Sequence, residues 1–388
     1  MDYAKKALLF SGAMIIAYNA QADDVTFYGV MSASVESASA TGASNGGATK
    51  PSQMRIEDDN SRIGIRGSDD LDNGLKAIWQ VESGLRDFAQ GGTTDWGQSA
   101  TLATRNTFIG LQDARYGKFI VGYNDNAYKS LVGGVTDFGI NVMASTTADN
   151  WGSGPGYYSI FSRGETRMKN SMHYTSPVVD SLQFAASYGF DESTTDSASG
   201  VDKSRYDLAG KYVLGGWKLG VGWDHQNDTA GYATSSSGKT GKSTNYYKLI
   251  SSYKFDEGTL IGAGIERGTY DATTSGTMSQ TGWTVAASQA LAGKWGLNGS
   301  YSRLGSLSHP TAGSPDDYKA TQWVVGTTYA LSRRTSLFAL YTRITNGAEQ
   351  NVNFGFNPVV TSTNDADTVA LADGSTVRAI GVGMTTSF

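Results

Sequence analysis

Hydrophobic and polar residues alternate with a period of two along most of this chain. Within residues 217–223, Leu219 and Val221 share one face, while Lys218 and Gly220 share the other. Successive side chains of a β-strand point to opposite sides, so this period predicts strands with one apolar face. Sixteen such segments are predicted, near residues 24–36, 55–67, 75–86, 102–112, 117–124, 168–176, 182–192, 204–214, 217–227, 244–255, 260–271, 280–291, 295–307, 320–332, 335–346 and 376–388.

The lengths of the segments and of their connections favour a membrane barrel. Tilted strands need ~9–11 residues to cross a bilayer, which is close to the length of most of these segments. Short turns such as 215–216 and 333–334 alternate with long loops such as 125–167 and 347–375, as in outer-membrane barrels. An unpaired sheet edge is too costly in lipid, so the first and last strands must pair. We therefore predict an all-β fold, a transmembrane antiparallel β-barrel. The alternative is a soluble sandwich with a buried apolar face.

Both ends of the chain carry features of exported proteins. Residues 1–22 have the pattern of a secretory signal peptide, in which Lys5 and Lys6 precede a short apolar stretch and a small-residue cleavage site. The terminal Phe388 closes an alternating segment and resembles the signal by which bacterial outer-membrane barrels are recognised and inserted. The predicted organisation is thus a signal peptide followed by one barrel domain, residues 23–388.

Composition excludes several classes of function. The chain has no cysteine, which excludes disulfides and thiolate metal sites. Removing residues 1–22 leaves 29 basic and 35 acidic residues, a net charge of −6, which argues against a nucleic-acid-binding surface. The three histidines, His173, His225 and His309, lie on separate predicted elements. We therefore expect no metal, no cofactor and no enzymatic activity.

Several stretches resemble the general diffusion porins of Gram-negative bacteria, of the betaproteobacterial type. They are DVTFYGVMSASVE from Asp24, Ser61 to Gly84, Arg105 to Tyr123, and Arg167 to Pro177. The resemblance implies a sixteen-stranded barrel, a homotrimer, and a third long loop, Asp125 to about Arg167, folded into the lumen. It also implies a water-filled outer-membrane channel for passive diffusion of ions and small hydrophilic solutes. The implied partners are outer-membrane lipid, lipopolysaccharide and the barrel-assembly machinery.

Strand parity and this resemblance together suggest residues that control selectivity. Ile63 and Ile65 face lipid in the predicted barrel, so Arg62 faces the lumen. Arg62 and Arg167 match, by motif position, arginines that line the constriction of anion-selective relatives. Arg105 shares the parity of lipid-facing positions and is the weakest basic candidate. The other candidates, which share the lumen parity or lie on the long loop, are Arg66, Arg86, Lys169, Asp125, Asp137, Asp149 and Glu165.

The predicted function is a porin with weak anion preference, set by the arginines despite the acidic total charge. One alternative is a substrate-specific channel with a saturable site, for which the aromatic cluster Trp151, Tyr157, Tyr158 and Phe161 on the long loop would serve. Two further alternatives are an outer-membrane enzyme and a surface adhesin.

Overall fold

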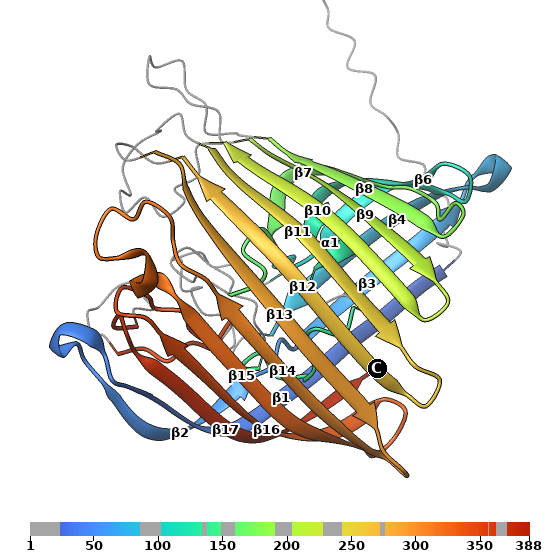
Figure 1. Cartoon of the computed structure of the whole chain (residues 1–388). Helices are drawn as coiled ribbons and strands as arrows, with labels where there is room; N and C mark the ends of the chain where they lie inside the picture. Colours follow the sequence, from blue (N-terminus) through green and yellow to red (C-terminus); the bar gives the residue numbers. More distant parts are fainter. Residues whose placement is uncertain are drawn as a thin grey trace, which may run out of the picture.

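The strands form one closed barrel wall (Figure 1). The computed structural model describes residues 24–85, 102–133, 138–148, 160–190, 204–227, 243–271, 276–355, 357–361 and 371–388. Within these residues, seventeen antiparallel strands belong to a single sheet. The sheet closes because β1 pairs with β17 over twelve register positions, from Val30 with Ser387 to Thr41 with Thr376. The predicted closure between the first and last strands is confirmed.

Most strands start and end within a few residues of the predicted segments. Their bounds are β1 Asp24–Thr41, β2 Lys50–Asp58, β3 Arg62–Asp70, β4 Leu75–Gly84, β5 Thr107–Asp113, β6 Gly117–Asp125, β7 Arg167–Thr175, β8 Leu182–Gly189, β9 Arg205–Leu214, β10 Trp217–Asn227, β11 Ser243–Lys254, β12 Thr259–Tyr270, β13 Met278–Ala290, β14 Trp295–Leu304, β15 Ala320–Ala330, β16 Thr335–Asn346 and β17 Thr376–Ser387. A short helix, α1 (Ala127–Val132), follows β6. In the described part of the chain, no helix combines the length and the apolar character needed to cross a membrane.

Strands β2 and β3 occupy one position in the wall, so the described barrel has sixteen positions, as predicted. The predicted segment 55–67 is interrupted, because residues 59–61 oppose only residues 31–32 of β1. Three residues therefore oppose two, and the one extra residue forms a β-bulge. Asn60 has φ of 66° there, and the amide of Ser61 donates to the Asp58 carboxylate at 2.8 Å.

The strand predicted at 102–112 begins five residues late, at Thr107. Before that point the Arg105 amide still donates to the Glu82 carbonyl at 3.0 Å, while side-chain oxygens accept from the neighbouring amides. The amide of Gly84 donates to the Thr104 hydroxyl at 2.9 Å, and the amide of Ala103 donates to the Ser83 hydroxyl at 2.9 Å.

The wall is apolar outside and polar inside. Leu219 and Val382 are 45% and 61% exposed, whereas Asp224 and Glu266 are completely buried. This is the arrangement of a barrel whose outer face meets lipid and whose interior is hydrated. The alternative prediction of a soluble sandwich is wrong, since its apolar face would be buried.

The connections differ in length between the two ends of the barrel. At one end, hairpins such as the one at Gly215 and Gly216 use very short turns, and Gly215 adopts φ of 56° there. The connections at the opposite end are longer and include residues 347–375 between β16 and β17. In outer-membrane barrels the longer connections are extracellular.

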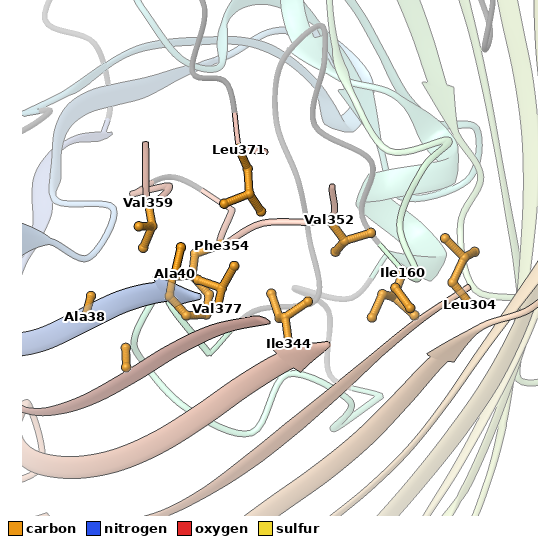
Figure 2. Close-up of a cluster of buried hydrophobic side chains, with 12 residues drawn as sticks. Ala38, Ala40, Ile160, Leu304, Ile344, Val352, Phe354, Val359, Leu371 and Val377 are labelled. Atoms are coloured by element: carbon orange, nitrogen blue, oxygen red, sulfur yellow. The ribbon is translucent and has the colours of Figure 1, made fainter. Parts of the chain in front are cut away.

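Part of this last connection packs against the buried faces of the strand ends (Figure 2). Figure 2 shows Phe354, Val359 and Leu371 beside Ala40 and Val377, with Ile344, Val352, Ile160 and Leu304 in the same cluster. This apolar cluster therefore lies at the mouth of the barrel, and further apolar clusters lie deeper, where α1 and residues such as Phe161 and Met143 pack against the inner wall.

Candidate functional site

Three arginines and two carboxylates form a cluster on the inner side of the wall. In this cluster, Nε of Arg105 lies 2.6 Å from a carboxylate oxygen of Glu82, and Nε of Arg62 lies 3.8 Å from the other. A guanidinium nitrogen of Arg167 lies 3.1 Å from the carboxylate of Asp125. The side chains of Arg62, Arg105 and Arg167 are 30%, 14% and 12% exposed, so the cluster keeps contact with solvent.

Asn106 binds both members of the Arg167–Asp125 half, and it directly follows Arg105 of the other half in the sequence. Its side-chain nitrogen donates to Asp125 at 3.1 Å, and its side-chain oxygen accepts from Nε of Arg167. The hydroxyl of Tyr28 donates to Glu82 at 3.0 Å. The cluster thus connects the β1, β3 and β4 part of the wall to β6 and β7.

Arg105 departs from its prediction. Strand alternation placed its side chain on the outer face, but the side chain instead binds Glu82 and donates to the Asn60 side chain at 2.7 Å. The reason is that β5 begins only at Thr107, so Arg105 is not held to the alternation of that strand. The weakest basic candidate is one of the most tightly bound members of the cluster.

Lys129 of α1 adds a fourth cation. Its ammonium lies 2.9 Å from Asp125. Burial lowers the pKa of Lys129 from its ordinary value, and the neighbouring Asp125 carboxylate opposes that shift. The Asn126 side chain caps α1 by accepting from the Lys129 amide at 3.0 Å, which holds the helix start beside the cluster.

The other predicted candidates lie apart from this cluster or cannot be placed. Arg66 is exposed, with its guanidinium 5.2 Å from the centre of the Tyr28 ring. Lys169 is exposed, 5.9 Å from the Tyr123 ring. Glu165 belongs to a different network, described next. Arg86, Asp137 and Asp149 fall outside the described residues, as do residues 1–22 of the predicted signal peptide.

A second network is fully buried, and of its members only Glu165 was a predicted candidate. Lys248 of β11 pairs with Glu165 and lies 3.5 Å from Glu266, its directly opposite partner on β12. Nε of Arg163 lies 3.1 Å from Glu266, and the Tyr128 hydroxyl donates to Glu266 at 2.9 Å. The sequence did contain one sign of this network, because Lys248 and Glu266 occupy inward positions on adjacent strands.

The described parts of residues 126–166 contact the inner faces of many strands. The amides of Ala127 and Tyr128 donate to Ser187 on β8 and Asp207 on β9, at 2.7 and 2.9 Å. The amide of Thr146 donates to Asp59 at the bulge, at 3.0 Å.

Glycines on the wall make room for the apolar side chains of the same segment. A Cβ at Gly264 would lie 2.4 Å from the Phe161 ring. A Cβ at Gly282 would lie 2.1 Å from the Ile160 carbonyl oxygen. These contacts reach from β8 to β13 and on to the start of β3.

A cavity of about 180 Å³ lies between α1 and strands β6 to β9. Lys118, Lys211 and His173 line it, together with Asp125 and with both polar and apolar side chains such as Gln183 and Leu131. Both ring nitrogens of His173 are hydrogen-bonded, to the hydroxyls of Ser171 and Ser187, at 2.8 and 2.9 Å. This arrangement explains His173 as a structural residue of the wall.

Comparisons with known proteins agree with the barrel fold. The profile of the family described as Gram-negative porin matches residues 7–349. An outer membrane porin protein of Bordetella pertussis is 27% identical over 312 residues, which cover 72% of this chain and 75% of the relative. The major outer membrane protein P.IB of Neisseria meningitidis (strain H44/76) is 27% identical over 340 residues, which cover 86% and 91%.

Solved structures share the fold at lower identity. The anion-selective porin from Comamonas acidovorans has a TM-score of 0.68 at 19% identity, over 94% of this chain and 99% of that one. A trimer form of OmpT of Vibrio cholerae has a TM-score of 0.63 at 16% identity, over 94% and 99%.

Proposed function

Because the chain belongs to the Gram-negative porin family and forms an outer-membrane channel for passive diffusion, we propose that its pore weakly prefers anions. Arg62, Arg105 and Arg167 set this preference in our proposal. The solutes are ions and small hydrophilic molecules. The family and fold are those of channels without enzymatic activity.

The observation that carries the proposal is the charge balance of the cluster. Arg62, Arg105, Arg167 and Lys129 supply four positive charges, whereas Glu82 and Asp125 supply two negative charges. The cluster thus has an excess of two positive charges, and passing ions experience it through the three arginines, which are partly exposed, whereas Lys129 is buried. Arginine keeps its charge at any physiological pH, so the part of the preference that the three arginines supply does not depend on titration. A structural neighbour is itself named as anion-selective.

We further propose that the third long connection folds into the lumen and narrows it beside the cluster. Its described parts bond to inner-face residues on separated parts of the wall, including Ser187, Asp207 and Asp59. A long connection with so many inward contacts favours a structured constriction over a surface loop. The side of the pore facing the arginines would then be built from the segment 126–166.

A homotrimer is the assembly that we propose. A fold neighbour is a trimer form, and the outer face of β1 to β5 exposes apolar side chains suited to lipid or to another subunit. These include Phe27, Ile65, Val81, Ile109 and Leu111. Sedimentation analysis of the detergent-solubilised protein should give three chains per particle, and a single chain per particle would refute this assembly.

Reversal potential in a planar bilayer across a potassium chloride gradient tests the selectivity. The mature protein should give a reversal potential that favours chloride. The triple variant Arg62→Gln, Arg105→Gln and Arg167→Gln should lose that preference. Arg267→Gln removes an exposed arginine outside the cluster and serves as the matched control. An unchanged permeability ratio in the triple variant would refute the role of the arginines.

A further inference from the structure

Two arginines face each other directly on the outer surface of the barrel. Arg343 of β16 and Arg378 of β17 are register partners, and both side chains are exposed. Directly opposed residues of antiparallel strands have Cβ atoms about 4.5–5.5 Å apart, and like charges at that spacing are destabilising. Among the described residues, neither arginine takes part in an ion pair, and Arg378 donates to the hydroxyl of Thr41 at 3.3 Å. Within the described parts of the chain, the pair is therefore a concentrated positive charge with no carboxylate between its members.

The position of the pair along the strands coincides with a membrane interface. Two residues further into the wall, Tyr341 and Ile380 are register partners on the same outer face, and Ile380 is 60% exposed. In the opposite direction the strands end at the long connection, residues 347–375. The arginines thus lie where the apolar band stops, on the side of the barrel assigned to the outer leaflet.

Other outward arginines lie at the same end, each opposite an aromatic residue. Arg267 is the register partner of Tyr247, and Arg303 is that of Trp283. Single arginines beside aromatic rings are common at membrane interfaces, because the aliphatic part of the arginine side chain lies along apolar surface while the guanidinium group stays in water. Arg343 has such a partner in Trp323, but it also faces a second arginine. The repulsion within that pair sets it apart from the single arginines.

We propose that Arg343 and Arg378 together bind one phosphate group on the headgroup of an outer-leaflet lipid. Two guanidinium groups at this spacing can each donate two hydrogen bonds to one phosphate, and the anion converts their repulsion into attraction. The acyl chains of the same lipid would lie against Tyr341, Ile380 and Val382, which extend the contact down the apolar wall. The apolar surface below the arginines is the reason for assigning the phosphate to a lipid and not to a free ion. This proposal requires the barrel to lie in an outer membrane, but not the ion preference of its pore.

The test compares the thermal unfolding of Arg343→Ser, Arg378→Ser and the double variant that carries both substitutions with that of the unchanged protein, in a nonionic detergent. Each protein is measured alone, with purified lipopolysaccharide, with the same lipid after enzymatic dephosphorylation, and with inorganic phosphate. Arg333→Ser is the matched control, because it removes an exposed arginine from the opposite end of the β15–β16 hairpin. The conductance of every variant is recorded in parallel, which separates failure of the lipid site from failure of the channel.

The effect of the serine substitutions on the unfolding temperature, relative to the unchanged protein, should change sign when the phosphorylated lipid is added. Without lipid, each serine variant should unfold at a higher temperature than the unchanged protein, since one member of a repelling pair is gone. With the phosphorylated lipid, the unchanged protein should gain stability and the double variant should bind the lipid roughly thirtyfold more weakly. Arg333→Ser should behave like the unchanged protein in both conditions.

Three outcomes would overturn the proposal. Equal stabilisation by the dephosphorylated lipid would show that the phosphate is not recognised. Equal stabilisation by inorganic phosphate alone would show a free-anion site. A lower unfolding temperature of the serine variants without lipid would mean that a carboxylate, such as one from a neighbouring subunit, already neutralises the arginines.

Discussion

The ammonium group of Lys248 and the carboxylate of Glu165 form an ion pair in which neither side chain is exposed to solvent. The ammonium also lies 4.6 Å from the centre of the Tyr128 ring and 4.7 Å from that of Phe161. Glu165, Tyr128 and Phe161 all belong to the connection between β6 and β7. One lysine of the wall therefore holds a carboxylate and two aromatic rings of that connection.

Replacing Lys248 by methionine should destabilise the protein strongly. The substitution leaves the carboxylates of Glu165 and Glu266 buried without the cation between them, and such a loss typically costs about 3–5 kcal/mol. Guanidinium-induced unfolding of the refolded barrel measures the effect. Lys211→Met is the control, because Lys211 also lines the interior but forms no ion pair among the described residues. Equal stability of the two variants would contradict this account of the network.

Replacing Glu82 by glutamine should increase the preference for anions. The variant removes one of the two carboxylates of the cluster, while glutamine can still accept the hydrogen bond from Tyr28. One unit charge at ~7 Å in water is worth about 0.6 kcal/mol, or roughly a threefold change in the anion-to-cation permeability ratio. Reversal potentials at low salt give this ratio directly. A ratio that moves towards cations would mean that the arginines of the cluster do not act on passing ions.

Replacing Gly282 by alanine should displace the segment near Ile160 and alter the conductance. The new Cβ would lie 2.1 Å from the Ile160 carbonyl oxygen, so either the strand or the segment must move. We expect the segment to move, because β13 is held by ladders on both sides. Single-channel recordings should show a changed or noisier conductance. Gly299→Ala is the control, since its Cβ would have its nearest neighbour at 3.6 Å. Identical recordings from the two variants would argue that the segment near Ile160 does not affect conduction through the pore.

Replacing Phe388 by alanine should lower the yield of assembled barrel more than the loss of one aromatic contact explains. The Phe388 ring lies 5.7 Å from that of Phe27, and its backbone exchanges hydrogen bonds with Gly29. Loss of an aromatic pair costs about 0.5–1.5 kcal/mol. Phe190→Ala removes a comparable outer-face pair, with Tyr188, and leaves the C-terminus intact. Assembly in membranes is measured for both variants, and equal yields would refute a special role for the terminal residue.

The barrel wall was predictable because its outer face is continuous in sequence as well as in space. Where each strand pairs with neighbours at both sides, lipid requires an apolar residue at every second position, and that requirement is visible without a structure. The bulge at residues 59–61 is also visible in the sequence, as a change in which positions, even or odd, carry the outward apolar residues. Met54 and Ile56 are exposed at even positions, whereas Ile65 is exposed at an odd one. The change of parity requires one extra residue between them.

The candidate site was less predictable, because its contacts join residues whose sequence positions share no periodicity. Parity correctly suggested that Arg62 faces inward, yet it misplaced Arg105, which lies just outside a strand. The partners of Lys248 depend on how an irregular connection folds, and no repeating pattern encodes that path. Where backbone ladders end, side-chain hydrogen bonds decide the geometry, and these are specific to each residue.

The pairing of β1 with β17 has a consequence for biosynthesis. Strand β17 follows all the other described strands in the sequence and pairs with β1, so residues near Val30 remain unpaired until residues near Ser387 have been made. An exported chain that lacks its final segment would retain two unpaired strand edges, which are prone to aggregation and expose backbone to proteases. A chain without β17 thus cannot form the closed sheet. Closure by β17 thereby makes a sealed barrel depend on the presence of every strand between β1 and β17.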